Sequence, residues 1–244
     1  MLNMLSEVAV DAHCHLDCFP EEKLRALPEG IIPVTAGYSH KSNVRNVEIA
    51  KKLHVPFTLG IAPQTAISEG VSGIQEWASF IRKNAPNAIG ECGLDFHWAK
   101  SEADIEKEKA AFVKMMELAE GMGLPLVIHS RKSDKEVLDA LEDFGWKGGF
   151  MMHFFSGNGK DAERALRMGG LISIIGMHAK GRREAIGRAP LEKIVVETDA
   201  PYAFRNIDGI YEGIRYVAEV KGISEKEVAH ATAQNAIRFF NIER

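Results

Sequence analysis

Short apolar runs recur along the whole chain, and their spacing constrains the fold more than any other feature. Each run is only a few residues long and is rich in Val, Ile, Leu, Phe or Met. Continuous apolar runs of this kind are typical of strands that are buried on both faces, as in a parallel sheet. We therefore expect strands at residues 8–12, 31–36, 57–61, 88–92, 124–128, 149–152, 171–175 and 194–196.

Longer amphipathic segments lie between these runs and predict helices. In the clearest segment, apolar residues such as Ile105, Phe112 and Met116 recur at helical spacing among Glu and Lys. Ser224 stands before two acidic residues and resembles a helix N-cap. The expected helices are residues 101–122, 132–144, 161–168, 182–186, 210–221 and 225–240.

Strand and helix alternate about eight times over 244 residues, which predicts an α/β protein with a parallel sheet. Eight repeats over this length favour a (β/α)8 TIM barrel. No linker or shift in composition marks a boundary, so we expect one domain over residues 1–244. A doubly wound open sheet is the alternative fold, but no glycine-rich phosphate-binding fingerprint follows any of the runs.

The composition limits the classes of protein to which this chain can belong. The net charge is −4, from 30 Lys and Arg against 34 Asp and Glu, which argues against a generic nucleic-acid coat protein. It does not exclude an enzyme that holds a phosphate through metal ions. The three cysteines are too few for a disulfide scaffold, and no apolar run is long enough to span a membrane. Residues 1–11 lack the pattern of a signal peptide, so we expect a cytoplasmic location.

The first and fourth runs end in residues that suit a metal ion. His13 and His15 are two apart on an extended segment, so their rings point to the same side. The plainer interpretation is two histidines in a surface loop. Glu91 lies within the fourth run between Gly90 and Cys92, where an unpaired carboxylate is costly to bury. It is interpreted either as a metal ligand or as the partner of an arginine within the barrel.

Three later runs end in the same way. His129 follows the fifth run, His153 follows the sixth, and Asp199 comes shortly after the eighth. In a (β/α)8 barrel all strand ends of one kind open on one face, where such enzymes keep their active sites. The six side chains are then expected to converge and to hold two divalent cations, and Glu91 is the natural bridge because each carboxylate oxygen can bind one ion. They are His13, His15, Glu91, His129, His153 and Asp199.

Five segments resemble, in order, the successive motifs of TatD-like metal-dependent hydrolases, which are amidohydrolase-type barrels. The match covers almost the whole chain, and the final segment 235–240 is similar to the closing helix of the family. The five segments are residues 11–17, 89–96, 125–131, 153–157 and 197–202.

The resemblance implies a TIM barrel with a binuclear site. One metal would be held by His13, His15, Glu91 and Asp199, and the other by Glu91, His129 and His153.

The sequence also departs from the family pattern. Ala62 stands where a histidine near the substrate is expected, Phe154 replaces a cysteine, and the segment after Tyr202 lacks the usual proline-rich loop.

These features predict a metal-dependent phosphodiesterase, a deoxyribonuclease that activates water with two divalent ions. Imidazole suits Zn, while carboxylate and water positions admit Mn or Mg. Asp199 and Glu91 are the expected catalytic residues, and Arg131, His178 and Tyr202 are expected to contact the substrate. DNA is the expected partner, with no membrane and no obligate protein partner.

Two other functions stay open at this point. The same metal site could hydrolyse an ester or amide, such as D-aminoacyl-tRNA, and the missing histidine at Ala62 keeps this alternative in view. In the second alternative, the protein is not an enzyme and the metals only stabilise the barrel. A complete ligand set argues against that, because a structural site has no use for open coordination positions.

Overall fold

The computed structural model describes residues 8–243, in which eight strands alternate with helices along the chain. The strands are hydrogen-bonded in the order of the sequence, from β1 to β8. This is the (β/α)8 TIM-barrel fold, and all eight strands expected from the apolar runs are present. The strands are β1 (Ala9–Cys14), β2 (Ile31–Ala36), β3 (Phe57–Leu59), β4 (Ala88–Asp95), β5 (Leu126–Arg131), β6 (Phe150–Met152), β7 (Leu171–Ile174) and β8 (Ile194–Val196).

The helices include all six that were expected, with small differences at their ends, and four earlier ones. Ser224 caps α10 as predicted, because its side chain accepts a hydrogen bond from the backbone N–H of Glu227 at 3.2 Å. The helices are α1 (Glu21–Arg25), α2 (His40–Leu53), α3 (Pro63–Glu69), α4 (Ile74–Asn84), α5 (Glu102–Met122), α6 (Asp134–Phe144), α7 (Gly159–Arg167), α8 (Lys180–Arg188), α9 (Ile210–Lys221) and α10 (Glu225–Phe239).

Helix α2 has a partly polar buried face, which weakens the apolar periodicity that predicts a helix. The amide of Asn43 donates to the carbonyl oxygen of Gly60 at 3.0 Å and accepts from its backbone N–H at 3.2 Å. Asn46 donates to the carbonyl oxygen of Ala36 at 3.2 Å. These bonds tie α2 to the segments that follow β2 and β3, and satisfy backbone groups that would otherwise be buried without a partner.

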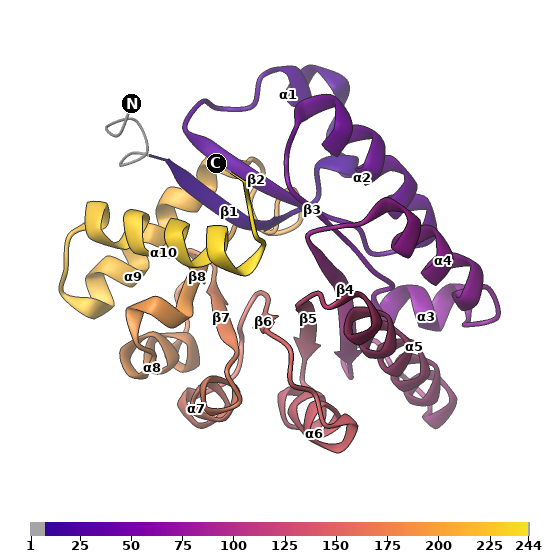
Figure 1. The fold of residues 1–244 in the computed structure, drawn as a ribbon. Coiled ribbons are helices and arrows are strands. Elements are labelled where there is room, and N and C mark those ends of the chain that lie inside the picture. Colours follow the sequence, from indigo (N-terminus) through magenta and orange to yellow (C-terminus); the bar gives the residue numbers. More distant parts are fainter. Residues whose placement is uncertain (1–7, 244) are drawn as a thin grey trace. The chain divides into compact units, whose positions relative to one another are not determined.

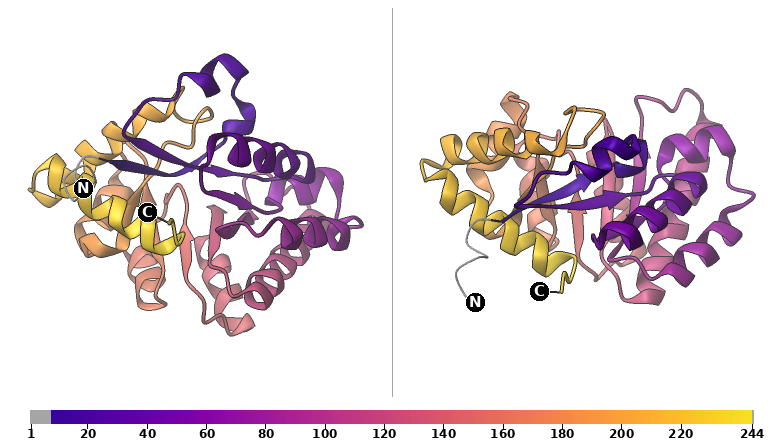
Figure 2. Two further views of the ribbon diagram at one scale, coloured as in Figure 1. Left: turned by 45° about the horizontal axis from the view of Figure 1, so that its top comes forward. Right: turned by 90° about the horizontal axis from the view of Figure 1, so that it is seen from above.

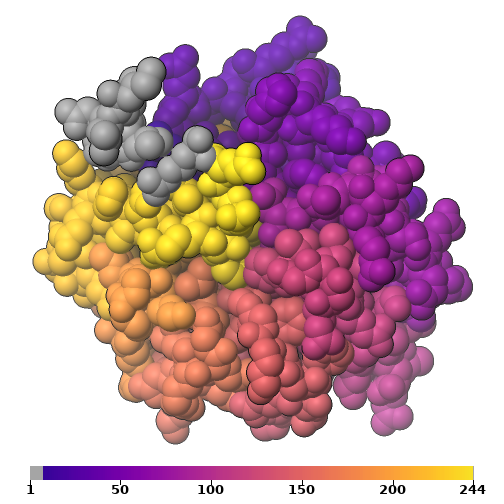
Figure 3. Space-filling model, viewed as in Figure 1, coloured from indigo at the N-terminus to yellow at the C-terminus, as the bar shows by residue number. Residues whose placement is uncertain are grey.

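The described chain forms two compact units. The first contains the chain up to Thr35 and from Phe154 onward. In this unit α10 packs along β1 and β8 (Figure 2). Asn235 of α10 donates to the carbonyl oxygens of Leu191 and Ile194, at 2.8 and 2.7 Å. Helices α9 and α10 pack against each other, and the C-terminal part of the chain, yellow in Figure 3, lies at the surface.

The second unit runs from Ala36 to His153. Here β4 and β5 are parallel neighbours, and the long helix α5 packs against β4 (Figure 1). The strands approach so closely that a Cβ atom at Gly93 would lie 2.0 Å from the carbonyl oxygen of His129. The absence of a side chain at Gly93 therefore allows the two backbones to approach each other this closely.

No helix among the described residues is both long enough and apolar enough to cross a membrane.

Candidate metal-binding site

In the second unit, three side chains from the ends of neighbouring strands meet around one carboxylate oxygen. Nδ1 of His129 lies 2.7 Å from Oε1 of Glu91, and Nε2 of His153 lies 3.4 Å from the same oxygen. The two imidazole nitrogens are 3.3 Å apart. Glu91 and His153 are buried and His129 is half-buried, so three metal-ligating atoms converge in a largely dry place.

The donor set of this cluster fits a divalent cation. Ligands about 2.0–2.1 Å from a tetrahedral zinc ion lie roughly 3.3 Å from one another, which is close to the separations here. Burial would raise the pKa of Glu91, but hydrogen bonds with His129 and His153 hold it well below its usual range. The carboxylate is therefore ionised, as a metal ligand must be.

Asp95 orients one ring of this cluster. Its Oδ2 lies 2.9 Å from Nε2 of His129 and accepts from the side chain of Gln64 at 2.8 Å. Burial by itself would lower the pKa of His129, but the hydrogen bonds to Asp95 and Glu91 raise this pKa to about 8. A carboxylate behind a ligating histidine fixes its tautomer and ring orientation. The sequence did not single out Asp95 or Gln64, although Asp95 lies within the segment 89–96 that resembles the family.

A second cluster lies in the first unit, at the ends of β1 and β8. Nε2 of His13 and Nε2 of His15 are 3.2 Å apart, so the two rings do point to the same side. Oδ1 of Asp199 lies 3.2 Å from Nε2 of His15 and 3.9 Å from Nε2 of His13. Two imidazoles and one carboxylate at these distances again fit a divalent cation.

Asp11 and Thr198 hold the two strand ends of this cluster together. The carboxylate of Asp11 accepts from the backbone N–H of Thr198 at 2.9 Å and from its hydroxyl at 2.5 Å. Burial raises the pKa of Asp11 to about 8, although the bonds from Thr198 oppose that shift. The backbone N–H of Asp199 donates to the carbonyl oxygen of His13 at 3.0 Å. Asp11 therefore positions the cluster and does not join it.

The two carboxylates after β8 have different surroundings. Glu197 is fully buried, and it accepts from the backbone N–H of Phe154 and from the hydroxyl of Ser173, both at 2.5 Å. Asp199 is partly exposed and has a left-handed backbone conformation, with φ 49°. Glu197 thus joins the ends of β7 and β8 to the segment after β6, while Asp199 faces the histidines.

Both clusters draw a ligand from an irregularity in a strand. The pairing of β1 with β2 shifts between Asp11 and Cys14, a stretch that contains His13. The pairing of β4 with β5 shifts between Ile89 and Cys92, a stretch that contains Glu91. A bulge bends a strand locally and re-aims a side chain, which is why bulges are common beside active sites. No sequence pattern pointed to either shift.

The three residues expected to contact substrate are exposed. Arg131 ends β5, two residues beyond His129, and its backbone pairs with Asp95. Tyr202 packs edge-on against the ring of His15, with centroids 5.0 Å apart. His178 follows β7 and stacks on Tyr216 at 4.0 Å. Their contact with substrate stays a prediction.

A (β/α)8 barrel with histidines and carboxylates gathered at its strand ends is the architecture of a metal-dependent hydrolase. Residues 10–241 match the family described as TatD related DNase. A Bacillus subtilis protein named "Uncharacterized metal-dependent hydrolase YabD" is 31% identical over 256 residues, covering 95% of this chain and 98% of that protein. The chain belongs to the TatD family of metal-dependent hydrolases, and the resemblance seen in its motifs is confirmed.

Two further relatives agree with this assignment. A Danio rerio protein named "Putative deoxyribonuclease tatdn3" is 27% identical, covering 95% of this chain and 97% of that protein. The crystal structure of YjjV, a TatD homologue from Escherichia coli K12, has the same fold, with a TM-score of 0.84 and 24% sequence identity. It covers 98% of this chain, and the match spans 100% of that chain.

Proposed function

We propose that this protein hydrolyses phosphodiester bonds of DNA with the help of two divalent metal ions. The observation that carries the proposal is the buried carboxylate of Glu91 between His129 and His153. A buried carboxylate that faces two imidazoles at ligand distances is the donor set of a catalytic metal in a hydrolase barrel.

The proposed ligands are the six side chains expected from the sequence. All six lie at or just after the carboxyl ends of strands, where enzymes of this fold class keep their active sites. We assign one ion to His13, His15, Glu91 and Asp199, and the other to Glu91, His129 and His153. The imidazoles suit Zn, while the carboxylates and water positions admit Mn or Mg.

Bound divalent ions lower the pKa of water and offset the negative charge of a phosphate. Asp199 would orient the attacking water and accept its proton, since its carboxylate is partly exposed while His13 and His15 beside it are buried. Glu91 would hold both ions at a fixed separation. Arg131, His178 and Tyr202 would contact the substrate from the exposed segments that follow three different strands.

DNA is favoured as the substrate by the family match and by the name of the Danio rerio relative, "Putative deoxyribonuclease tatdn3". Ester or amide hydrolysis, such as deacylation of D-aminoacyl-tRNA, is the second candidate. It is favoured by Ala62, which caps α3 where the family resemblance leads one to expect a histidine. A methyl group cannot contact a phosphate oxygen by hydrogen bonding or charge.

The deciding experiment is an activity screen of the purified full chain with added Mn, Mg or Zn. Single- and double-stranded oligodeoxynucleotides are compared with aminoacyl-tRNA and simple esters. We expect cleavage of DNA, and its loss in Glu91→Gln. Deacylation without DNA cleavage would overturn the proposal in favour of the second candidate, and full activity in metal-stripped Glu91→Gln would overturn the metal mechanism.

The extent of the domain, residues 1–244, and a cytoplasmic location remain predictions, as does independence from a protein partner.

A further inference from the structure

The loop between β4 and α5 presents a large aromatic side chain to solvent. Trp98 is 51% exposed, whereas the other two tryptophans, Trp77 and Trp146, are half-buried. The ring of His97 packs edge-on against Trp98, with centroids 5.1 Å apart. An exposed indole costs free energy in water, and single-strand-binding proteins use such rings as platforms for bases.

Three cationic residues lie near His97, whose ring packs against Trp98. Asp95 pairs with Arg131 across β4 and β5, and the backbone N–H of Phe96 donates to the carbonyl oxygen of Arg131 at 3.0 Å. The residues that follow the two strands therefore lie side by side. Lys100 donates to the carbonyl oxygen of His97 at 2.5 Å. Desolvation lowers the pKa of His97, and the charges of Arg131, Lys132 and Lys100 lower it further, which places all three near it.

The loop is tied to the metal cluster by one carboxylate. Oδ1 of Asp95 accepts from the backbone N–H groups of His97 and Trp98, at 3.0 and 3.2 Å. Oδ2 of the same side chain lies 2.9 Å from Nε2 of His129. The aromatic and cationic residues thus stand within a few residues of the cluster formed by Glu91, His129 and His153, at the carboxyl ends of the same two strands.

We propose that Trp98, Arg131, Lys132 and Lys100 form a binding subsite for single-stranded DNA, in which a base stacks on Trp98 and the cations contact flanking phosphates. Although the net charge of the chain is −4, three cations beside the His97–Trp98 pair form a local positive group. Cations next to an exposed indole match a polyanion whose bases are unpaired. This inference rests on the proposed function and names the form of the substrate. A duplex, whose bases are stacked inside, cannot use the ring.

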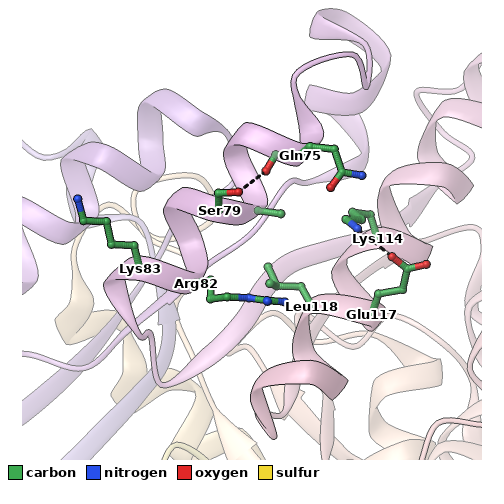
Figure 4. Close-up of a pocket in the computed structure, with 8 residues that line it drawn as sticks. Gln75, Ser79, Arg82, Lys83, Lys114, Glu117 and Leu118 are labelled. Atoms are coloured by element: carbon green, nitrogen blue, oxygen red, sulfur yellow. Dashed lines mark hydrogen bonds and ion pairs between the residues drawn. The ribbon is translucent and has the colours of Figure 1, made fainter.

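A second basic surface provides a matched control. A groove of about 580 Å³ lies between α4 and α5 and is lined in part by Arg82, Lys83 and Lys114 (Figure 4). It has no aromatic ring, and Lys114 is paired with Glu117 at 3.0 Å. Removing Arg82 and Lys83 therefore changes the net charge as much as removing Arg131 and Lys132, without touching the proposed subsite.

The test is binding of a short fluorescent phosphorothioate oligothymidylate to the purified full chain, measured by anisotropy over a range of salt concentrations. We expect Trp98→Ala to weaken binding about fivefold or more, and Trp98→Phe to bind within about twofold of the parent. Arg131→Gln with Lys132→Gln should lower the slope of log K against log salt by about 1. Arg82→Gln with Lys83→Gln, and Tyr211→Ala as an exposed aromatic control, should leave both quantities unchanged.

Unchanged binding in Trp98→Ala would overturn the subsite, as would tighter binding of a duplex or of an RNA of the same sequence. If the metal-loaded parent still cleaves DNA in that case, the proposed function stands and only the subsite fails. If no DNA is cleaved under any metal, the proposed function fails, and the effect of Trp98→Ala on binding still decides the subsite.

Discussion

Oδ2 of Asp95 and Nε2 of His129 are 2.9 Å apart, and the other nitrogen of that ring faces Glu91 at 2.7 Å. In the neutral ring, the carboxylate of Asp95 accepts a hydrogen bond from Nε2–H, which leaves the lone pair of Nδ1 directed at the cluster. The hydrogen bond thus decides which nitrogen can bind a cation.

Asp95→Asn should reverse this tautomer. The remaining oxygen stays opposite the backbone N–H groups of His97 and Trp98, so the new amide group faces Nε2 of His129 and donates to it. The proton then sits on Nδ1, and we expect metal affinity to fall about 10- to 100-fold. Chelator competition measures the affinity, and ring ¹⁵N shifts in the metal-free protein, recorded above about pH 8 where the ring is neutral, report the tautomer. Asp143→Asn, an exposed change of the same charge, is the control. Equal affinity in both variants would refute the role of Asp95.

The pH dependence of stability should report on Glu108. This carboxyl group of α5 is fully buried, its Oε2 accepts from the backbone N–H of Asp95 at 3.1 Å, and burial raises its pKa from 4.5 to about 7. Between these values the unfolded chain releases a proton that the folded chain keeps, so the free energy of unfolding falls as pH rises from 4.5 to 7.

Glu108→Gln removes this loss of stability. Above about pH 7 its free energy of unfolding should exceed that of the parent by on the order of 2 kcal/mol. Urea unfolding at a series of pH values provides the measurement. Glu106→Gln, whose side chain is 73% exposed on the same helix, is the control. If the free energy of unfolding depended on pH in the same way in the parent and in Glu108→Gln, ionisation of Glu108 would not destabilise the fold.

Substitution of Asp199 should reduce activity, whereas substitution of Glu197 should reduce stability. Asp199→Asn keeps the size of the side chain, so we expect a melting temperature close to that of the parent and a loss of hydrolysis of about 100-fold or more. Glu197→Ala leaves the buried groups of Phe154 and Ser173 without this partner, at a cost on the order of 2 kcal/mol or more. Thermal melts measure the stability of the two variants, turnover measures their activity, and elemental analysis measures their metal content. If Asp199→Asn loses all metal, Asp199 acts mainly as a ligand and not as the base.

Gly93 should tolerate no side chain. A Cβ there would lie 2.0 Å from the carbonyl oxygen of His129, and its φ of +138° is one that other residues rarely adopt. Gly93→Ala must therefore move β4 away from β5, and we expect a loss of about 3 kcal/mol or more, seen as a lower urea midpoint or as insoluble protein. Gly187→Ala in α8 is the control. Its Cβ would enter open space, so stability should rise by up to about 1 kcal/mol. Similar midpoints for the two variants would contradict the close approach.

The sequence by itself determined the strands and the residue types at their ends. A strand that is buried on both faces is largely apolar, so each strand is visible as a run, and a polar residue such as His129 or Asp199 stands out near its end. The six ligand candidates follow from that contrast. Helix α2 was not predicted, because Asn43 and Asn46 occupy its buried face, where hydrogen bonds to backbone replace apolar contacts.

The tertiary structure alone decided which polar residues serve which partner. The structural role of Glu197 is not visible in the sequence, because its donors lie on β7 and after β6 and are distant in the chain. Asp95 and Gln64 are 31 residues apart and meet only when the segments after β3 and β4 fold side by side. Burial leaves a local pattern along a chain, but the pairing of hydrogen-bonding groups depends on directions in space that only the folded chain fixes.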